Sequence, residues 1–407
     1  MLKSFTVSNF YSIGLEPQSV SLEVSKKDCL NESFSVVGSQ NFTLIAGLVG
    51  ANGSGKSNIL KGLSFLISWI NDSYLKVPPL IGSSYDYSQG IGGYKAHALH
   101  QDKESCFTIE FYNEQDLYRY KLVLNGPFIL NEVLEKKTNT RFKKIFSLSR
   151  HGEKLDLSIS TELNLNKSDK ERFLSRCLTV PIFSSLLNTG YLPKILFFKR
   201  SYLSINQSSI SSYPSAAERH LIQNQNQDSK LEDKTIKLMK SLDIGISDHF
   251  FLDLQDTNKK ILCLRHKTLT GAEFDLFLHD ESHGTRTAFN LFLKIIPVLE
   301  EGGLIVIDEI ETNIHPHLIQ KILSLFMNKK INKYNAQILF STHQALLLKE
   351  LTKTQIFIVE KNKEDLTTEI YRLDEVEGVR NDENYAQKYL SGTYGGVPDI
   401  DWLNKGF

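Results

Sequence analysis

Apolar and polar positions divide the chain into segments that predict different structures. Residues 2–10 alternate apolar and polar side chains, which predicts an edge strand. The apolar run from Phe42 ends in glycines and predicts a buried strand, and the stretch from about Lys56 to Asn71 predicts a helix. Between residues 105 and 148, CFTIEF and YRYKLVL are separated by YNEQDL, a hairpin-like spacing. This part of the chain therefore predicts an antiparallel β meander.

Residues 151–248 show a different pattern, which predicts a mainly helical insertion with long loops. NLNKSDKERFLSRCL predicts a helix, with Ser168 as the candidate N-cap ahead of Glu171. A stretch rich in Ser, Asn and Gln, residues 204–230, predicts exposed loop with short helices, and a second helix is expected over 231–242. Sustained heptads are absent from the sequence, which argues against a long coiled-coil arm.

A regular pattern returns after residue 249. Strands are expected near 260–266 and 273–279, then a helix from Gly284, the buried strand GGLIVID and a helix after His315. AQILFST and QIFIVE predict two further strands. Apolar strands that alternate with helices predict a largely parallel sheet covered by helices. We therefore predict an α/β fold in three parts: an N-terminal half (1–150), an insertion (151–248) and a C-terminal half (249–407).

Composition and charge narrow the function only a little. The 407 residues include 47 basic and 47 acidic side chains, so a uniformly basic nucleic-acid-binding surface is not expected. Two local basic stretches, 135–144 and 194–203, keep nucleic-acid contact open as an alternative to ordinary solvated segments. The four cysteines form no CxxC pair, and the longest apolar run falls well short of the roughly 20 residues of a membrane span. We expect a cytoplasmic protein with no membrane association.

One motif carries specific chemistry. GANGSGKS, residues 50–57, fits G-x-x-x-x-G-K-[ST] and lies between a predicted strand and a predicted helix, the context of a phosphate-binding loop. Lys56 is expected at the β- and γ-phosphates of ATP, and Ser57 at Mg²⁺. The alternative is a glycine-rich turn that binds no nucleotide. The expected nucleotide-binding residues here are Gly50, Asn52, Gly53, Ser54, Gly55, Lys56, Ser57 and Asn58.

Acidic residues at the end of a later strand complete the expected site. LIVIDE ends in Asp308, the expected Mg²⁺-linked acid, and Glu309, the expected general base. The alternative to this catalytic interpretation is that the two acids are only solvated side chains at the end of a strand. The following His315 and His317 raise the possibility of a metal cluster, but they lie seven or more residues beyond Asp308. Pro316 suits the first position of a helix, so we interpret the histidines as a helix entry.

His343 closes the apolar strand FSTH and is the third candidate catalytic residue, with Glu309 and Lys56. From this position its side chain would hydrogen-bond the γ-phosphate or the attacking water. A polar strand cap is the alternative. Glu311 has no assigned role.

Six segments occur in the order that is typical of one group of ATPases. They are NFYSIG, GANGSGKSN, DESHGT, IDEIETNIHPHL, FSTH and YLSGTYGGVPDI. The chain resembles an ATP-binding-cassette ATPase of the RecF and SMC-like branch, and more narrowly the single-head ATPases of the OLD-type and abortive-infection group. The resemblance covers both ends of the chain and is thin across about 150–248.

The resemblance implies roles that spacing alone does not. Ser282 and Gly284 match the signature motif, which closes over the nucleotide of a second protomer, although His283 and Arg286 depart from its common glycine-rich form. A simple helix cap, at Ser282 or Thr285, is the alternative. The segment with Asn313 and His315 is implied to lie along the dimer interface. The glutamine of the Gln loop has two candidates, Gln89 and Gln101, and stays unassigned.

The resemblance also implies a function. Proteins of this group form a homodimer through two shared ATP sites, or a larger homo-oligomer, and act beside a separate effector, often a nuclease, in anti-phage defence. FIVEKNKED lacks the glycine of a Toprim nuclease strand end, and no suitable D-x-D follows, so the effector is expected on another protein. The alternative is a DNA repair or recombination ATPase that binds DNA directly. A transporter subunit fits poorly because of the long insertion and the His-Pro pair.

Overall fold

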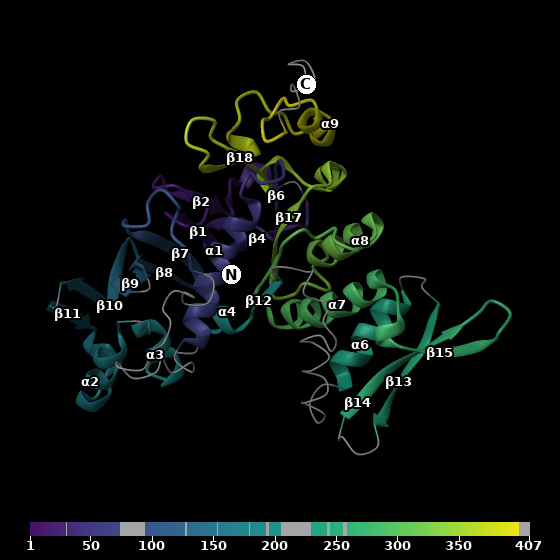
Figure 1. The fold of residues 1–407 in the computed structure, drawn as a ribbon, viewed down its shortest axis with the longest axis horizontal. Coiled ribbons are helices and arrows are strands. Elements are labelled where there is room, and N and C mark those ends of the chain that lie inside the picture. The colour runs from purple at the N-terminus through teal and green to yellow at the C-terminus, as the bar shows by residue number, and fades with distance from the viewer. Residues whose placement is uncertain are drawn as a thin grey trace.

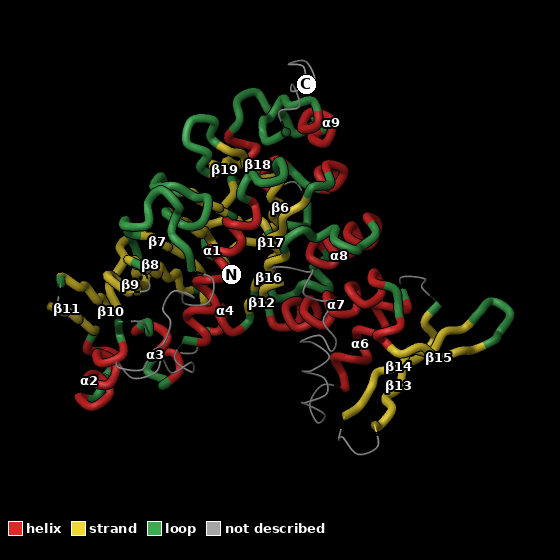
Figure 2. The backbone as a smooth tube through the Cα atoms, viewed as in Figure 1, coloured by secondary structure: helices red, strands yellow, loops and turns green. Residues whose placement is uncertain are grey.

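The computed structural model describes residues 1–29, 31–73, 94–126, 128–152, 154–178, 180–192, 195–204, 229–241, 245–254 and 259–398. The Ser/Asn/Gln-rich loop prediction and Gln89 lie outside these residues, the first for nearly its whole length. The described chain is a mixed α/β fold with two large sheets, and helices lie between and beside them (Figures 1 and 2). The α/β prediction is therefore confirmed. Among the described helices, none has both the length and the apolar character needed to cross a bilayer.

The six-stranded sheet is the parallel sheet that the sequence predicts. Its order is β12-β16-β17-β6-β18-β19, and only β19 runs antiparallel to its neighbour. The strands are β12 (Ser201–Ser204), β16 (Leu304–Ile307), β17 (Gln337–Thr342), β6 (Ile45–Val49), β18 (Ile356–Lys361) and β19 (Thr368–Arg372). Four of them are buried along most or all of their length because both faces of the sheet are covered.

Alternate residues of β16 pack into two separate hydrophobic cores, one on each face of the parallel sheet. Leu304 and Val306 pack with helix α1 (Lys56–Asp72) and the second large sheet, whereas Ile305 and Ile307 pack with helices α7 (His283–Glu301) and α8 (Pro316–Met327). The helix α1 is thus enclosed between the two sheets. The other face of the parallel sheet is covered by α7 and α8. The predicted helices after Lys56, from Gly284 and after His315 are confirmed.

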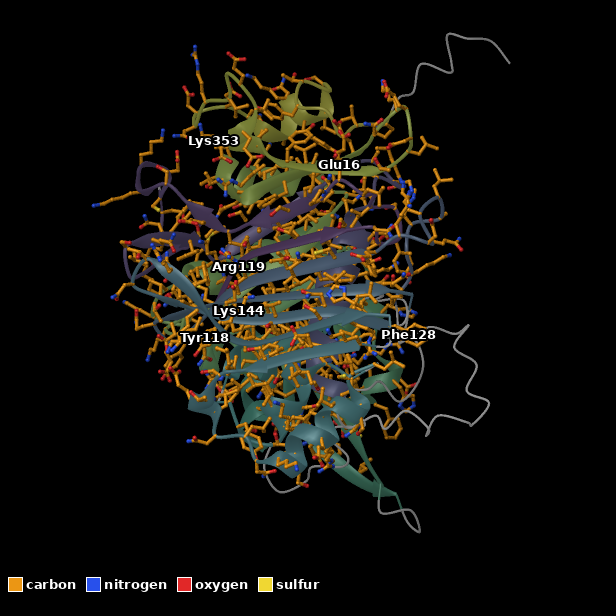
Figure 3. The ribbon with its side chains drawn as sticks, turned by 90° about the vertical axis from the view of Figure 1, so that its left-hand side faces the viewer. Glu16, Tyr118, Arg119, Phe128, Lys144 and Lys353 are labelled. Atoms are coloured by element: carbon orange, nitrogen blue, oxygen red, sulfur yellow. The ribbon has the colours of Figure 1, made fainter. Side chains whose placement is uncertain are left out.

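The second large sheet has seven antiparallel strands in the order β11-β10-β9-β8-β7-β1-β2, and Figure 3 shows it face on. Its strands are β1 (Leu2–Ser8), β2 (Gln18–Ser21), β7 (Ser105–Asn113), β8 (Asp116–Asn125), β9 (Phe128–Thr138), β10 (Arg141–His151) and β11 (Lys154–Ile159). The predicted meander is confirmed and continues past residue 150. The predicted edge position of β1 is wrong, because β2 pairs with it on the outer side.

The insertion contains four described helices: α2 (Lys167–Arg176), α3 (Ile182–Asn188), α4 (Leu196–Lys199) and α6 (Ser229–Lys240). The expected cap of the first is wrong. Asn166 is the N-cap, and its Oδ1 accepts a hydrogen bond from the Asp169 N–H at 2.7 Å, whereas Ser168 lies inside the helix. The N-terminus of α3 is capped from the meander, where the buried Glu132 accepts hydrogen bonds from the N–H groups of Ile182 and Phe183.

Two smaller sheets complete the fold. One consists of β13 (Ile246–Leu254), β14 (Lys259–Lys267) and β15 (Glu273–Phe277) and projects from the body beside α6 (Figure 1). The other contains β3 (Glu23–Val24), β5 (Gln40–Thr43) and β4 (Phe34–Val37). A last helix, α9 (Tyr385–Leu390), packs beside the segment that follows β17. Strand β13 was not predicted. The proposed three-part division of the chain stays a prediction.

Candidate nucleotide site

The loop between β6 and α1 has the backbone of a phosphate cradle. Gly53 and Gly55 adopt left-handed φ values of 77° and 109°. A Cβ atom on Gly55 would lie 1.9 Å from the Thr368 side-chain oxygen, and one on Gly50 would lie 2.1 Å from the Val359 carbonyl oxygen. Glycine is therefore required where β18 and β19 press against the loop. The N-terminus of α1 follows directly, which places unpaired N–H groups at an anion site.

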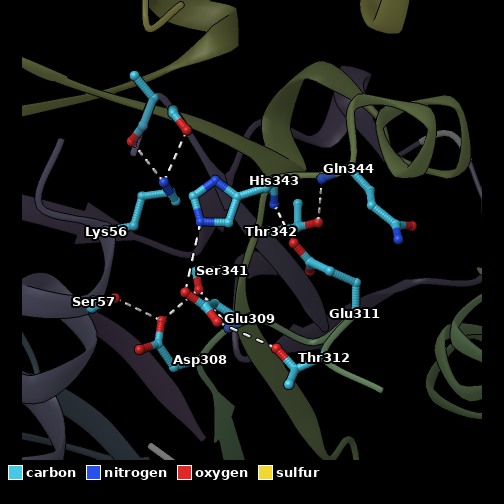
Figure 4. A network of polar contacts seen from close by, with 12 residues as sticks. Lys56, Ser57, Asp308, Glu309, Glu311, Thr312, Ser341, Thr342, His343 and Gln344 are labelled. Carbon is cyan, nitrogen blue, oxygen red and sulfur yellow. Dashed lines mark hydrogen bonds and ion pairs between the residues drawn. The ribbon is translucent and has the colours of Figure 1, made fainter. Parts of the chain in front are cut away.

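Lys56 lies within this loop rather than in solvent. Its Nζ donates hydrogen bonds to the carbonyl oxygens of Gly50 at 2.8 Å and Ala51 at 2.9 Å, and its exposed fraction is 4% (Figure 4). Burial lowers the pKa of Lys56 to about 8, although nearby carboxylates, Asp308 foremost, act in the opposite direction. The ammonium group is thus positioned inside the loop and is only partly compensated by acids.

A hydrogen-bonded chain links the loop to the predicted acidic pair. Ser57 Oγ donates to Asp308 Oδ1 at 3.0 Å, and Ser341 Oγ donates to the same oxygen at 2.6 Å. The Glu309 N–H in turn donates to Ser341 Oγ at 2.7 Å. The parallel register of β16, β17 and β6 brings these residues to one edge of the sheet, because the carboxyl ends of parallel strands lie together. Ser341 was not predicted; its only signal was its place beside Thr342 and His343.

Glu309 points away from this buried chain. Its φ is 51°, a left-handed value, and its side chain is 52% exposed. Glu309 Oε1 lies 3.8 Å from His343 Nε2, and Glu309 Oε2 accepts a hydrogen bond from Thr312 Oγ1 at 3.3 Å (Figure 4). Glu311 Oε1 accepts a hydrogen bond from the His343 backbone N–H at 2.5 Å, so this acid fixes the position of the histidine.

The residues present suit MgATP. Ser57 and Asp308 offer hard oxygen donors of the kind that Mg²⁺ prefers. The buried Ser54 Oγ is without a hydrogen-bond partner among the described atoms and lies in the loop that the glycines open. Among the described residues, no group of three or more His, Cys, Asp or Glu side chains has the arrangement of a metal cluster.

The two histidines after the acids serve the next helix. His315 is the N-cap of α8, with its Nδ1 3.3 Å from the His317 N–H that donates to it, and Pro316 occupies the first turn. The predicted helix entry is confirmed.

The candidate signature residues lie in a different place from the network of Figure 4. Ser282 caps α7 and accepts a hydrogen bond from the Thr285 N–H at 3.1 Å. A Cβ atom on Gly284 would lie 3.1 Å from the Asn313 carbonyl oxygen. These residues line a cavity of about 470 Å³ together with His315. The structure therefore brings Ser282 and Gly284 to the segment after the acids and not to Lys56.

A set of hydrogen bonds behind the phosphate loop, which we call the brace, was not predicted from the sequence. Asn58 Nδ2 donates to Ser12 Oγ at 2.7 Å, and Ser12 Oγ lies 2.7 Å from Thr368 Oγ1. Thr368 Oγ1 donates to the Ser54 carbonyl at 2.9 Å. The N-terminal NFYSIG segment and β19 thereby hold the loop from behind. Of these residues, Asn58 and Ser54 were predicted from the motif. Ser12 lies in the NFYSIG segment but had no assigned role, and Thr368, more than 300 residues away in sequence, had no signal.

The remaining candidates contribute less. Asn52 is exposed at the tip of the loop. Gln101 is also exposed and donates to the Ala98 carbonyl, so its assignment to a Gln loop stays open. In the basic stretch 194–203, Phe197 and Phe198 are buried and offer no stacking surface to a nucleic-acid base. In the stretch 135–144, two of the basic side chains have acidic partners, in the pairs Lys136–Asp116 and Lys143–Glu162.

Structural comparison matches solved structures at low identity. An SMC head bound to the C-winged helix domain of ScpA is 14% identical, with 93% of this chain and 99% of that chain covered and a TM-score of 0.49. The SMC head domain from Thermotoga maritima is 14% identical, with 91% and 98% covered and a TM-score of 0.40. The Smc head domain with an extended coiled coil, bound to the C-terminal domain of ScpA from Pyrococcus furiosus, is 13% identical, with 96% and 99% covered and a TM-score of 0.44.

Sequence comparison identifies the family. No curated protein sequence matches the chain. The profile of the family described as "AAA domain, putative AbiEii toxin, Type IV TA system" matches residues 45–349, which include the phosphate loop, Asp308 and His343. This range covers well over half of the 407 residues. The chain therefore belongs to this family of AAA-domain, P-loop ATPases.

Proposed function

We propose that the chain hydrolyses ATP in a site shared by two copies of itself, and that this ATP-dependent assembly controls a separate effector protein, a nuclease, in a bacterial anti-phage system. One observation carries the ATPase part: the 3.0 Å contact between Ser57 and Asp308, continued through Ser341 to Glu309. It joins the phosphate loop to the acid that would act on water. The effector part rests on the family resemblance of the sequence motifs.

The loop would hold the triphosphate. Lys56 exchanges its bonds to the Gly50 and Ala51 carbonyls for phosphate oxygens, so the ammonium is already close to its place when ATP arrives. Ser57, the nucleotide and water would hold Mg²⁺, with Asp308 behind them, and the ion would supply positive charge to the β- and γ-phosphates. The left-handed glycines let the backbone N–H groups of the loop turn toward the same anion.

Glu309 would act on the water. The water oxygen attacks the γ-phosphorus as the bond to the ADP oxygen breaks, and the proton lost by the water passes to the Glu309 carboxylate. His343 lies beside that carboxylate, 3.8 Å away, and would orient the water or the γ-phosphate. The hydrogen bond from the His343 backbone N–H to Glu311 Oε1 holds the backbone at this position.

Two copies would complete each site. Ser282 and the start of α7 line the 470 Å³ cavity, which does not include Lys56, and this supports a role for the helix terminus at the γ-phosphate held by another protomer. Asn313, which lines the same cavity, would then lie at the interface. His283 and Arg286 contact each other at 3.0 Å beside Ser282, so the first turn of the helix also carries an arginine. Larger homo-oligomers can be built from such dimers.

The effector hypothesis is tested in the native host. A tagged Glu309→Gln variant, which traps ATP, is purified with ATP, and the proteins that accompany it are compared by mass spectrometry with those that accompany the Lys56→Ala variant. We expect a nuclease encoded beside this gene to be recovered in larger amount with the ATP-trapping variant. Equal recovery with both variants would contradict ATP-dependent control.

Direct DNA binding is the alternative function, and its test is independent of the purification. Fluorescence anisotropy of a labelled duplex measures binding by the isolated protein at increasing salt. A DNA repair ATPase predicts tight binding that falls steeply with salt, because cations are displaced from the phosphates. We expect weak binding at all salt concentrations, in line with the balanced charge and the buried Phe197 and Phe198.

A further inference from the structure

A second cavity has a strongly basic rim. It lies near the C-terminal ends of α7 and α8, whereas the 470 Å³ cavity lies at their N-terminal ends. It measures about 600 Å³ and lies between α6, the last turns of α7 and the segment that joins α8 to β17. Its lining includes the lysines Lys234, Lys237, Lys330 and Lys333. Among its described lining residues, Glu300 is the only acid, and it is already paired with Lys234. In a chain with equal numbers of acids and bases, this is a local excess of positive charge.

The interior of this lysine cavity is apolar. Leu238 from α6, Leu299 from α7 and Leu325 from α8 contribute to its walls. At the rim, Ile331 is 44% exposed and Tyr334 is 63% exposed, although both are large hydrophobic side chains. Exposed apolar side chains surrounded by charge are typical of surfaces that bind another protein. The cavity therefore offers hydrophobic contact and cationic groups to the same ligand.

The segment that forms the rim is held in a fixed shape. The buried Asn332 donates to the Phe326 and Ala336 carbonyls at 3.0 and 2.9 Å, and its Oδ1 accepts a bond from the Ala336 N–H at 2.7 Å. Gly302, at the end of α7, has a φ of 77°, and a Cβ atom there would lie 2.8 Å from the Tyr334 carbonyl. The rim is thus pre-organised, which lowers the entropy cost of binding.

Two helices connect this cavity to the proposed dimer interface. Ser282 at the start of α7 and His315 at the start of α8 line the 470 Å³ cavity, whereas Leu299 and Leu325 near their ends line the lysine cavity. With 19 residues, α7 is about 28 Å long at 1.5 Å per residue. A shift of the start of α8 upon closure of two protomers would be transmitted to the Leu325 wall of the lysine cavity, whereas Pro297 interrupts α7 before Leu299.

We propose that the lysine cavity docks an acidic segment of a partner protein, with a leucine-like or aromatic side chain of that segment inserted into the apolar interior. Charge complementarity selects the acidic residues, and the walls select the apolar anchor. A nucleic acid fits less well: the interior is aliphatic, one aromatic side chain cannot stack successive bases, and Glu300 would repel phosphates. Since the partner is taken to be the effector, this inference rests on the proposed function.

The test uses a fluorescein-labelled synthetic peptide of glutamate pairs alternating with leucine, and the full-length protein. Anisotropy measures its affinity for wild type, for Lys237→Glu/Lys330→Glu and for Ile331→Ser. We expect saturable binding, a loss of about tenfold or more in the charge-reversed variant and a smaller loss for Ile331→Ser. Lys329→Glu is the matched control, because Lys329 lies in the same segment outside the cavity lining, and we expect its affinity to stay near that of wild type.

Two further probes complete the design. A peptide with glutamine in place of glutamate tests the charge requirement, and labelled single-stranded thymidine oligonucleotide tests the nucleic-acid alternative. Absence of saturable peptide binding, equal loss in Lys329→Glu, or oligonucleotide binding that responds to the same variants without peptide binding overturns the proposal. A change of mass in light scattering caused by Lys237→Glu/Lys330→Glu alone would assign the face to a second copy and also overturn it.

The test separates this inference from the proposed function. The Lys56→Ala variant, which is expected not to bind ATP, should bind the peptide as wild type does in the absence of nucleotide. Peptide binding in a chain that proves unable to hydrolyse ATP would leave the docking site standing and remove the ATPase proposal. The reverse result, ATP hydrolysis without peptide binding, would remove only the docking site.

Discussion

The proposed phosphate-holding residues and the proposed hydrolytic residue Glu309 differ in how far they are buried. Lys56 and Asp308 are nearly buried, with exposed fractions of 4% and 7%, and hydrogen bonds position both. The Glu309 side chain is 52% exposed, although it follows Asp308 directly. Under the proposed function, the single chain holds the nucleotide phosphates, and a second copy would cover the exposed surface at Glu309.

The backbone explains how two adjacent acids come to lie in such different surroundings. Asp308 continues the inward alternation of β16 and meets Ser57 and Ser341. At Glu309 the φ of 51° turns the chain, so that its side chain leaves the sheet edge. Left-handed φ values are uncommon for residues other than glycine, and they cluster at functional sites. The turn at Glu309 thus separates Asp308, the proposed metal-linked acid, from Glu309, the proposed general base.

Lys56→Ala should have the largest effect on function, because Lys56 is the buried cation of the phosphate loop. Removal of the ammonium leaves the phosphates without their main cationic contact, so ATP binding should fall by about a hundredfold or more. Isothermal titration calorimetry with MgATP measures the loss. Lys61→Ala, on the same helix, is the control and should bind as wild type does. Unchanged binding by Lys56→Ala would remove the phosphate-loop assignment.

Glu309→Gln should impair ATP hydrolysis and leave ATP binding intact, because it changes only the exposed carboxylate. The amide cannot accept the water proton, so steady-state ATP hydrolysis should fall by about 100- to 1000-fold while MgATP binding persists. Phosphate release measures the rate, and light scattering with ATP should show an enriched dimer. Glu350→Gln, an exposed acid hydrogen-bonded to Gln320, is the control. A wild-type hydrolysis rate in Glu309→Gln would show that another group is the base.

The pH dependence of ATP binding tests whether Lys56 is as buried as the structure shows, in contrast to the exposed Glu309. Burial lowers the pKa of this group to about 8, so the charged form that phosphates need is lost as the pH rises through that value. The affinity for MgATP should therefore fall by about tenfold between pH 7 and pH 9. Calorimetry in buffers of different ionisation enthalpy should also show proton uptake on binding at pH 9. A flat affinity profile over this range would contradict the lowered pKa.

Thr368→Val should give the smallest effect, because it loosens the brace without touching the nucleotide. The change removes the hydroxyl that bonds the Ser54 carbonyl and meets Ser12, so the loop loses support from β19. We expect MgATP affinity to weaken several-fold, with the hydrolysis rate at saturating ATP nearly unchanged. Thr367→Val, which removes only a contact to Asp365, is the control. A larger rate loss than affinity loss would place Thr368 closer to the chemistry.

The sequence predicted the local parts of this architecture well and the long-range parts poorly. The strand-loop-helix around Lys56 and the helix entry at Pro316 follow from residue patterns within a few positions of each other. The brace through Ser12 and Thr368 depends on strand order, which no local pattern encodes. The same reason explains the wrong edge position of β1: its partner β2, with the sequence QSVS, has too few apolar residues to predict a strand.

Mixing two inactive variants tests whether two copies of the chain share each ATP site. Lys56→Ala retains Ser282, and Ser282→Arg retains the phosphate loop, so a mixed dimer contains one intact site made from both chains. We predict that an equal mixture recovers about one quarter of the wild-type hydrolysis rate, since half of randomly formed dimers are mixed and each has one working site of two. Lys56→Ala mixed with Glu309→Gln should recover nothing, because both changes damage the same half. A mixture of Lys56→Ala and Ser282→Arg that stays as inactive as its components would contradict the account.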